Sequence, residues 1–225
     1  LKHWKNKLKK RKNLITVAID SPAAAGAGTQ AKLIAKHYNL FYLDTGKIYR
    51  FIGQLKLKNP KNFTYTLIKK QIKNLKIKNL QNKDLLLDKV AVSASIIAKN
   101  KIIRKIVYNF QIKCAYNPPK KYSGSILDGR DITSVIMKDA MFKFFITATI
   151  KIRAIRRFKE YSQVNKKITY NSVLKSLKQR DSSDKLRKYG PLVKTKDSIL
   201  INTSKLSKTS CFQKIKHIMD RKLKA

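Results

Sequence analysis

The sequence predicts an α/β fold, a parallel five-stranded sheet with helices on both faces. Five short apolar segments alternate with segments whose apolar residues recur at helical spacing, which is typical of the strand–helix units of a parallel sheet. The 225 residues are 43% hydrophobic, enough for one well-cored domain and too much for a wholly disordered chain. We therefore expect a single domain over residues 14–225, preceded by a basic tail over residues 1–13.

Each element follows from its own residues. Segment 14–19 is apolar and partly β-branched, as a buried parallel strand requires, and the polar or rigid residues 20–22 end it. Asn59 and Pro60 break the helix that starts near Gly46. The remaining strands are expected at residues 40–44, 125–128, 142–148 and 198–202. The remaining helices are expected at residues 29–38, 65–75, 88–99, 101–115, 150–161, 166–188 and from 207 to the end.

The residues after the first strand are small and match a phosphate-binding loop in part. Small side chains let backbone N–H groups curl around a phosphate, and the following helix N-terminus adds partial positive charge. The pattern G-x-x-x-x-G-K-[ST] is damaged, because Ser21 replaces the first glycine and Ala27 replaces the lysine. A tight turn that packs a helix on a sheet explains the same residues, and Thr29 either contacts a phosphate or caps the helix. The candidate loop comprises Ser21, Pro22, Ala23, Ala24, Ala25, Gly26, Ala27, Gly28 and Thr29.

The net charge of +41, from 53 basic and 12 acidic residues, has two interpretations. One is a surface that binds nucleic acid or an anionic membrane. The other is a compositional bias that covers a solvated surface with lysine, and the spread of lysine over almost every segment favours it. The tail over residues 1–13 is expected to be flexible, with an RNA-contacting arm as the alternative.

Other features narrow the class of protein. Cys114 and Cys211 are isolated, which favours free thiols in a reducing compartment. The three histidines have no metal-ligand spacing, so no protein metal site is expected. No apolar run approaches a membrane span and no signal-peptide segment is visible, so we expect a cytoplasmic protein without a membrane partner.

Three polar segments come directly after predicted strands, following Asp20, Asp44 and Asp128. In open parallel sheets, ligands bind at the carboxyl ends of the strands. These three segments are therefore expected to meet there, and this coincidence carries more weight than any single motif.

Four segments occur in a meaningful order: IDSPAAAGAGT, YLDTGKIYR, ILDGRDI, and RAIRRF followed by QRDSSDKLRKYGPL. Together they resemble the bacterial cytidylate kinase family of P-loop nucleoside-monophosphate kinases, from about residue 14 to the C-terminus. LDTGKIYR and LDGRD separate this family from adenylate and guanylate kinases. The resemblance implies transfer of the γ-phosphoryl group of ATP, which carries Mg²⁺, to CMP or dCMP. It also implies an arginine-rich lid over residues 150–190 and a reduced monophosphate-side region over residues 59–87, and we expect a monomer.

The resemblance also assigns residues to roles. Phosphoryl transfer needs cations around phosphates, and arginine forks match phosphate oxygens. Asp131 would accept from the exocyclic amine of cytosine, and Asp184 would hold the ribose. The implied catalytic residues are Arg130, Arg180 and Arg187. The implied CMP-binding residues are Thr45, Arg50, Ser95, Arg104, Arg130, Asp131 and Asp184. The implied ATP-binding residues are those of the loop together with Arg153 and Arg157.

Some of these residues have a second interpretation. Arg153, Arg156 and Arg157 are equally well explained as surface charge. Asp128 either orients the magnesium shell or caps the turn that follows it.

Three departures from the family pattern bear on activity. Ala27 removes a cation that neutralises charge between the β- and γ-phosphates, which costs about 10²–10³ in rate against typical accelerations above about 10⁶. We therefore expect an active kinase in which Lys32 or a lid arginine substitutes. Ser183 and Lys185 stand where the family often has arginines. The stretch between residues 60 and 87 is helical or irregular instead of strand-rich, which leaves the selectivity for cytosine over uracil open.

Two other functions are compatible with these residues. A degenerate kinase fold would bind nucleotide or RNA without turnover, but the intact monophosphate-side residues argue against it. A kinase for a different nucleoside monophosphate is the other alternative.

Overall fold

A single parallel sheet forms the centre of the computed structural model, which describes residues 14–163 and 167–224. Its strand order is β2-β3-β1-β4-β5, and every neighbouring pair is parallel, so the predicted α/β fold class is confirmed. The strands are β1 (Ile15–Asp20), β2 (Leu40–Asp44), β3 (Gly124–Gly129), β4 (Phe142–Thr147) and β5 (Ile199–Asn202). The basic tail, Lys166 and Ala225 lie outside the described residues.

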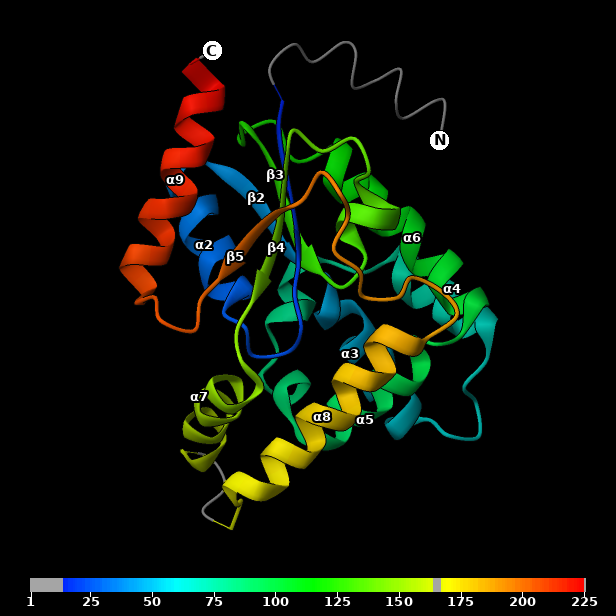
Figure 1. The fold of residues 1–225 in the computed structure, drawn as a ribbon. Helices are drawn as coiled ribbons and strands as arrows, with labels where there is room; N and C mark the ends of the chain where they lie inside the picture. Colours follow the sequence, from blue (N-terminus) through cyan, green and yellow to red (C-terminus); the bar gives the residue numbers. More distant parts are fainter. Residues whose placement is uncertain (1–13, 164–166, 225) are drawn as a thin grey trace.

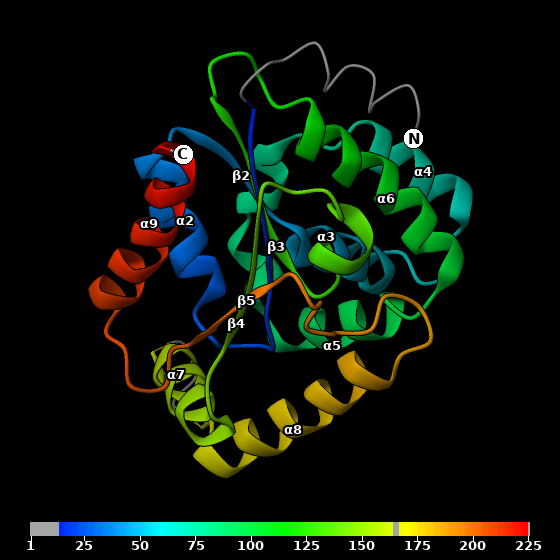
Figure 2. The same ribbon diagram turned by 45° about the horizontal axis from the view of Figure 1, so that its top comes forward.

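Helices cover both faces of the sheet (Figure 2). α2 (Ala27–His37) and α9 (Lys208–Lys224) lie on one face, where Ile19 of β1 is fully buried in their shared core. Ala18 faces the opposite core, because successive side chains of a strand alternate between faces. The helices on that side are α3 (Thr45–Lys58), α4 (Tyr65–Lys73), α5 (Asp88–Ile97) and α6 (Lys101–Tyr116).

Two further helices pack together at the end of the sheet where the chain leaves β1 (Figure 1). They are α7 (Ile150–Ser162) and α8 (Tyr170–Leu186). A small core joins them to the loop after β1, and it contains Ala23, Ala154, Val173 and Leu177. The region expected to be a lid is therefore packed against the candidate phosphate loop.

Short helical turns are the main difference from the sequence-based assignment. A π-helical turn, η3 (Ile132–Ile136), follows β3 where the sequence predicts a simple turn. Two 3₁₀ helices, η1 (Ile77–Gln81) and η2 (Lys83–Leu86), connect α4 to α5, and the described chain between those helices contains no strand. α2 starts at Ala27, two residues earlier than predicted, because Gly26 already serves as its N-cap.

Candidate active site

The carboxyl ends of β1, β2 and β3 meet at one edge of the sheet. In the strand register Asp44 lies opposite Asp128, and Asp20 lies opposite Gly129. The Ser21 amide donates to the Gly129 carbonyl (3.1 Å), which ties the loop after β1 to the turn after β3. The three polar segments therefore lie together, as the sequence predicts.

The loop between β1 and α2 has a backbone suited to an anion. Ala24 (φ 61°) and Gly26 (φ 93°) both adopt the left-handed conformation, which glycine tolerates but which costs an alanine about 1–2 kcal/mol. Because Gly26 caps α2, the amides of Ala27, Gly28 and Thr29 belong to the first helical turn and have no partner within the helix. These amides and the helix dipole make a site for a phosphate, beside which the Thr29 side chain is exposed.

Arg153 connects this loop to the lid region. Its side chain is buried; Nη1 donates to the Ala23 carbonyl (3.1 Å) and Nε donates to the Ala148 carbonyl (3.0 Å). Its guanidinium also forms a two-point ion pair with Asp181 of α8, with 3.0 Å between Nη1 and Oδ1. The surface-charge interpretation of Arg153 is therefore wrong, and its contact with ATP stays a prediction.

The next two arginines of α7 point to different parts of the site. Arg156 donates from Nη2 to the Thr203 carbonyl (2.8 Å) and from Nη1 to Thr203 Oγ1 (2.9 Å), next to the loop. Arg157 instead pairs with Glu160 (2.9 Å) and lies over the Tyr161 ring, 5.2 Å from its centroid. Arg156 is thus on the loop side and Arg157 faces the other half of the site.

Asp20, at the end of β1, anchors the turn that carries Arg130 and Asp131. Its carboxylate accepts from the amides of Ile132 (2.7 Å) and Thr133 (2.8 Å) and from the Thr133 hydroxyl (2.6 Å). Complete burial raises the pKa of Asp20 to about 6, although these three donors oppose the shift. The sequence marks Asp20 only as the end of a strand, so its anchoring role was missed.

A network of alternating charges lies beyond this turn. Asp131 pairs with Arg104 of α6, and Arg187 lies 3.6 Å from the second oxygen of Asp131. Asp184 of α8 accepts from Arg130 Nε (2.7 Å) and lies 3.7 Å from Arg187. The structure thus joins five of the predicted residues, which come from α6, the turn after β3, and the end of α8.

Four arginines, Arg50, Arg130, Arg157 and Arg180, converge next to this network, and the carboxylates of Asp184, Asp128 and Asp44 lie near them. Burial, followed by the charges of Arg130, Arg50 and Arg157, lowers the pKa of Arg180 to about 10. Burial and then the charges of Arg157 and Arg130 also lower the pKa of Arg50, whose Nη1 donates to the Leu85 carbonyl (2.7 Å). Arg180 Nε is buried without a hydrogen-bond partner in the described part of the chain. Such a concentration of guanidinium groups is suited to binding an anion.

A cavity of about 310 Å³ opens beside this cluster between α5, α7 and α8. Arg157 and Arg180 line it together with Ser95 of α5. Ser183, where the family often has arginine, also lines it. The cavity therefore places the predicted residue Ser95 on the same side of the site as the arginine cluster.

The end of β3 is packed too tightly for any side chain at Gly129. Thr45 Oγ1 donates to the Asp128 carbonyl (2.8 Å), and it would clash with a Cβ on Gly129. Burial and the nearby charge of Asp44 raise the pKa of Asp128 well above its ordinary value. One oxygen of Asp128, Oδ1, has no hydrogen-bond partner among the described residues, and Oδ2 is beside Gly28 of the loop.

This carboxylate is the natural protein group for a magnesium ion that arrives with a nucleotide. Mg²⁺ is commonly held by one or two carboxylates together with substrate phosphates and water, and a loop hydroxyl such as that of Thr29 is a usual additional ligand. Within residues 14–163 and 167–224, no group of three or more histidine, cysteine or acidic side chains forms a metal site by itself. The residues present fit a nucleotide-carried ion.

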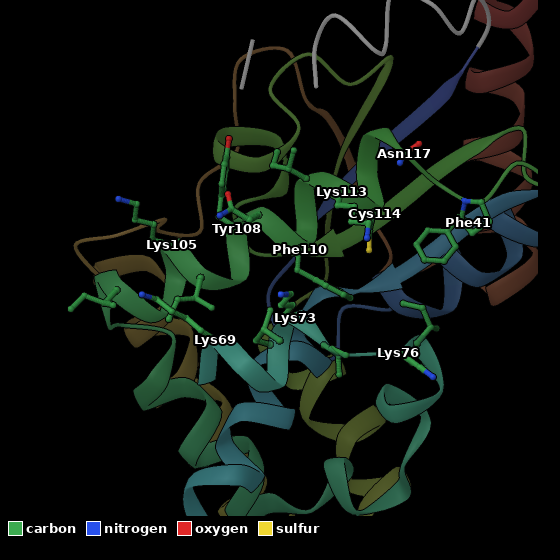
Figure 3. A pocket seen from close by; sticks show the side chains of 18 of the residues that line it. Phe41, Lys69, Lys73, Lys76, Lys105, Tyr108, Phe110, Lys113, Cys114 and Asn117 are labelled. Atoms are coloured by element: carbon green, nitrogen blue, oxygen red, sulfur yellow. The ribbon is translucent and has the colours of Figure 1, made fainter. Parts of the chain in front are cut away.

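A groove of about 1330 Å³ along α4 and α6 lies away from this edge of the sheet (Figure 3). Phe41, near the start of β2, lines its far end, whereas the loop lies at the opposite ends of the strands. None of its lining residues is acidic. The lysines that line it are Lys69, Lys73, Lys76, Lys101, Lys105 and Lys113. Because lysine is also dense elsewhere in the chain, these side chains do not single out a nucleic-acid surface.

The structure gathers most of the predicted residues but also shows some that sequence reasoning missed. Arg153 and Asp181 are a buried pair, and Thr203 contacts the loop through the Ala25 carbonyl (2.9 Å). Asp181 lies within the segment QRDSSDKLRKYGPL but was given no role there, and Thr203 carries no local sequence signal. Each acts on residues far away in the chain, so the sequence did not show its contact. Lys32, one of the two predicted sources of a substitute cation, is exposed on α2.

Among the described residues, none of the helices is long and apolar enough to cross a membrane.

Comparisons with known proteins show the family of the chain. The family model described as "Cytidylate kinase" matches residues 17–221. A cytidylate kinase of Fusobacterium nucleatum is 40% identical over 205 residues, covering 86% of this chain and 91% of the relative. One of Clostridium botulinum (strain Langeland) is 36% identical over 219 residues, covering 92% of this chain and 98% of the relative. One of Azorhizobium caulinodans is 36% identical over 205 residues, covering 91% of this chain and 98% of the relative.

A solved structure, of an uncharacterized protein from Eubacterium ventriosum, shares the fold with a TM-score of 0.54 and 16% identity over 92% of this chain and 98% of that one. It supports the fold alone. The family model covers nearly all of the described residues, including the loop, the turn after β3 and the end of α8. On this evidence, the chain belongs to the cytidylate kinase family.

Proposed function

We propose that this protein transfers the γ-phosphoryl group of ATP to CMP or dCMP, which gives ADP and CDP or dCDP. Membership of the cytidylate kinase family supports this reaction, and so do the names of the relatives. All of the proposed site residues come from one chain, so a monomer suffices, and we place it in the cytoplasm, where its nucleotide substrates are found.

The observation that carries the proposal is the arginine cluster. The charges of Arg130 and Arg50 contribute to the lowered pKa of Arg180, the charge of Arg130 contributes to the lowered pKa of Arg50, and Arg180 Nε is buried without a hydrogen-bond partner in the described chain. Holding like charges together costs free energy that a bound phosphate would recover, because guanidinium forks match phosphate oxygens. The acceptor phosphate of CMP is the anion that fits this place.

The charge network next to the cluster fits the rest of the acceptor nucleotide. Asp131, which pairs with Arg104, presents carboxylate oxygens to which the exocyclic amine of cytosine could donate. Uracil carries a carbonyl at that position and would meet a carboxylate, which is repulsive. Asp184 would accept from the ribose hydroxyls while Arg130 and Arg187 keep it ionised, in line with its lowered pKa.

The chemistry asked of the protein is mainly electrostatic. As the phosphoryl group moves, negative charge spreads over its oxygens and over the leaving ADP, and fixed cations stabilise it without reorganisation. Arg130, Arg180 and Arg187 are the residues that would meet this charge from the acceptor side. The loop amides between Ala23 and Gly28 would hold the donor phosphates.

Magnesium would supply further charge neutralisation for the donor triphosphate when ATP is bound. Asp128 is the carboxylate that would face it, since its Oδ1 has no hydrogen-bond partner in the described residues. The Thr29 hydroxyl is the other candidate ligand. We propose that the ion arrives with ATP and is not retained by the protein alone.

A coupled ADP-release assay across CMP, dCMP, UMP and AMP tests the proposal. We expect turnover to be highest with CMP or dCMP and to require Mg²⁺. Absence of ADP release with all four acceptors, from a protein that still binds ATP, would contradict it and favour a nucleotide-binding protein without turnover.

A variant sharpens the assignment of the base. Asp131→Asn should lower kcat/KM for CMP by about 10- to 100-fold, because one charge-assisted hydrogen bond worth about 1.5–3 kcal/mol is lost. It should also narrow the preference for CMP over UMP. Asp220→Asn on α9, where Asp220 pairs with Lys216, is the matched control and should leave both values unchanged. An unchanged preference in Asp131→Asn would remove Asp131 from the base pocket.

A further inference from the structure

The donor loop lacks the cation that its sequence pattern normally carries. In the P-loop pattern a lysine reaches the β- and γ-phosphates, and here Ala27 takes its place as the first residue of α2. Ala27 is buried among the alanines at the base of this helix and offers no charge. If the reaction proposed above occurs, another side chain must face the phosphates at this point.

Two cations near the loop do not suit that role. Lys32 is exposed on α2, one turn further along the helix. Arg153 touches the loop at the Ala23 carbonyl, but its charge is neutralised by the two-point ion pair with Asp181. Its position is that of a structural link between the loop and α8.

Arg156 differs from both. Its Nη1 lies 3.5 Å from the Ala25 carbonyl and 3.8 Å from the position that a Cβ on Gly26 would take. The other hydrogen bonds of its guanidinium go to the carbonyl and hydroxyl of Thr203, which are neutral acceptors. Among the residues that the structure describes, no carboxylate forms an ion pair with Arg156.

Arg156 is therefore a full positive charge held by neutral oxygens directly beside the residues that precede Ala27. Thr203 Oγ1 also donates to the Ala25 carbonyl (2.9 Å), so Thr203 fixes the loop and the guanidinium relative to each other. The left-handed Gly26 presents no side chain on the face toward Arg156, which leaves the approach open.

We infer that Arg156 supplies the donor phosphates with the positive charge that Ala27 lacks. The inference rests on the proposed function and adds a residue to it. The cation then comes from α7 and is held by Thr203, which follows β5. The usual lysine belongs instead to the helix that follows the loop. A guanidinium can engage two phosphate oxygens at once, so one arginine is chemically sufficient for the exchange.

The test asks whether a lysine at position 27 restores the activity that is lost when Arg156 is replaced. Arg156→Gln should lower kcat by about 10²–10³, the loss expected for one oriented electrostatic donor. Adding Ala27→Lys to Arg156→Gln should restore most of that loss. Adding Ala27→Met, which has similar length but no charge, should not, and Arg221→Gln on the exposed end of α9 should leave kcat unchanged.

A purely structural role for Arg156 predicts different results. In that case Ala27→Lys does not rescue Arg156→Gln, and Arg156→Lys, which keeps the charge but loses the paired contacts with Thr203, is as impaired as Arg156→Gln. Either result, or an unchanged kcat in Arg156→Gln, overturns the inference. Rescue by Ala27→Lys together with largely retained activity in Arg156→Lys supports it.

Binding of ATP without CMP separates this inference from the proposed reaction. Calorimetric titration with Mg²⁺ and ATP measures binding to the donor site, and titration with adenosine, which has no phosphate, is the uncharged comparison. Arg156→Gln should weaken ATP much more than adenosine, and Ala27→Lys should reverse the change. If the wild type binds ATP in this way but releases no ADP with any acceptor, the reaction fails while the assignment of Arg156 stands.

Discussion

The donor loop (residues 21–29) and the proposed acceptor pocket differ in the groups that they present. The acceptor pocket is the arginine cluster together with the charge network around Asp131 and Asp184. The loop presents backbone amides, and its side chains depart from the usual pattern at Ser21 and Ala27. The acceptor pocket presents side chains, and Arg130 and Asp131 stand there in their expected places among other charged groups. A site built from backbone tolerates changes of residue that a site built from charged side chains does not.

The physical reason is that different groups would bind the ligand in the two regions, backbone amides in the loop and charged side chains in the pocket. Gly26 caps α2, so its first amides and its dipole face a phosphate whatever the loop side chains are. In the pocket, by contrast, Asp131 and Asp184 are buried in ion pairs with specific arginines, and removing one partner leaves another charge unpaired at a cost of several kcal/mol. We therefore expect substitutions in the pocket to have larger effects than substitutions in the loop backbone.

The largest effect is expected for Arg130. Arg130→Gln removes a guanidinium from the acceptor cluster and leaves Asp184 without its closest ion pair. We expect kcat/KM for CMP to fall by at least about 10³, because the loss of the electrostatic donor is combined with an unpaired buried carboxylate. The measurement is ADP release at saturating ATP, with thermal unfolding to confirm that the variant folds. A loss smaller than tenfold in a folded variant would contradict the contrast between the two regions.

The second effect concerns stability and pH at the junction of the two regions. The pKa of Asp20 is raised from its ordinary value of 3.8 to about 6, so the folded protein keeps this proton where the unfolded chain has lost it. Between about pH 4 and pH 6 the free energy of unfolding should therefore fall as pH rises, by up to about 3 kcal/mol from this group. Above and below that window its contribution is constant.

Urea unfolding of the wild type and of Asp20→Asn across this pH range isolates the contribution of Asp20 to the free energy of unfolding. The difference between the two free energies should change between pH 4 and pH 6 and be level above pH 7. A difference that does not vary with pH would show that Asp20 has the same pKa in both states.

The smallest effect is expected within the loop. Ala24→Gly relieves the left-handed strain of an alanine at φ 61°, but glycine also loses more entropy on folding, so the gain should be only about 0.5–1 kcal/mol. The matched control is Ala25→Gly, at a buried position outside the left-handed region, which should destabilise the protein by about 1 kcal/mol. Equal changes of the same sign in the two variants would indicate that strain at Ala24 is not the cause.

Much of the fold was predictable because it rests on local patterns. The five strands follow from short apolar segments that alternate with helical ones, and the meeting of the segments after Asp20, Asp44 and Asp128 follows from the parallel topology this predicts. The contacts across the chain were not predictable by the same means. Arg130 and Asp184 are 54 residues apart, and the pair forms only because α8 packs over the end of the sheet.

The family resemblance supplied what local patterns could not, with one limit. It identified the charged residues of the acceptor pocket, but it could not show which cation lies beside a loop without its lysine. That answer depended on the packing of α7 against the loop and against Thr203, which places Arg156 there and turns Arg157 toward Arg50 and Arg180.

A crystal structure with CMP and a non-hydrolysable ATP analogue bound together is the most direct measurement. We predict that the CMP phosphate contacts Arg50, Arg130 and Arg180, that cytosine faces Asp131, and that Arg156 lies against the β- or γ-phosphate over the loop. Finding the two nucleotides elsewhere, or these side chains directed away from the phosphates, would contradict the account of both halves of the site.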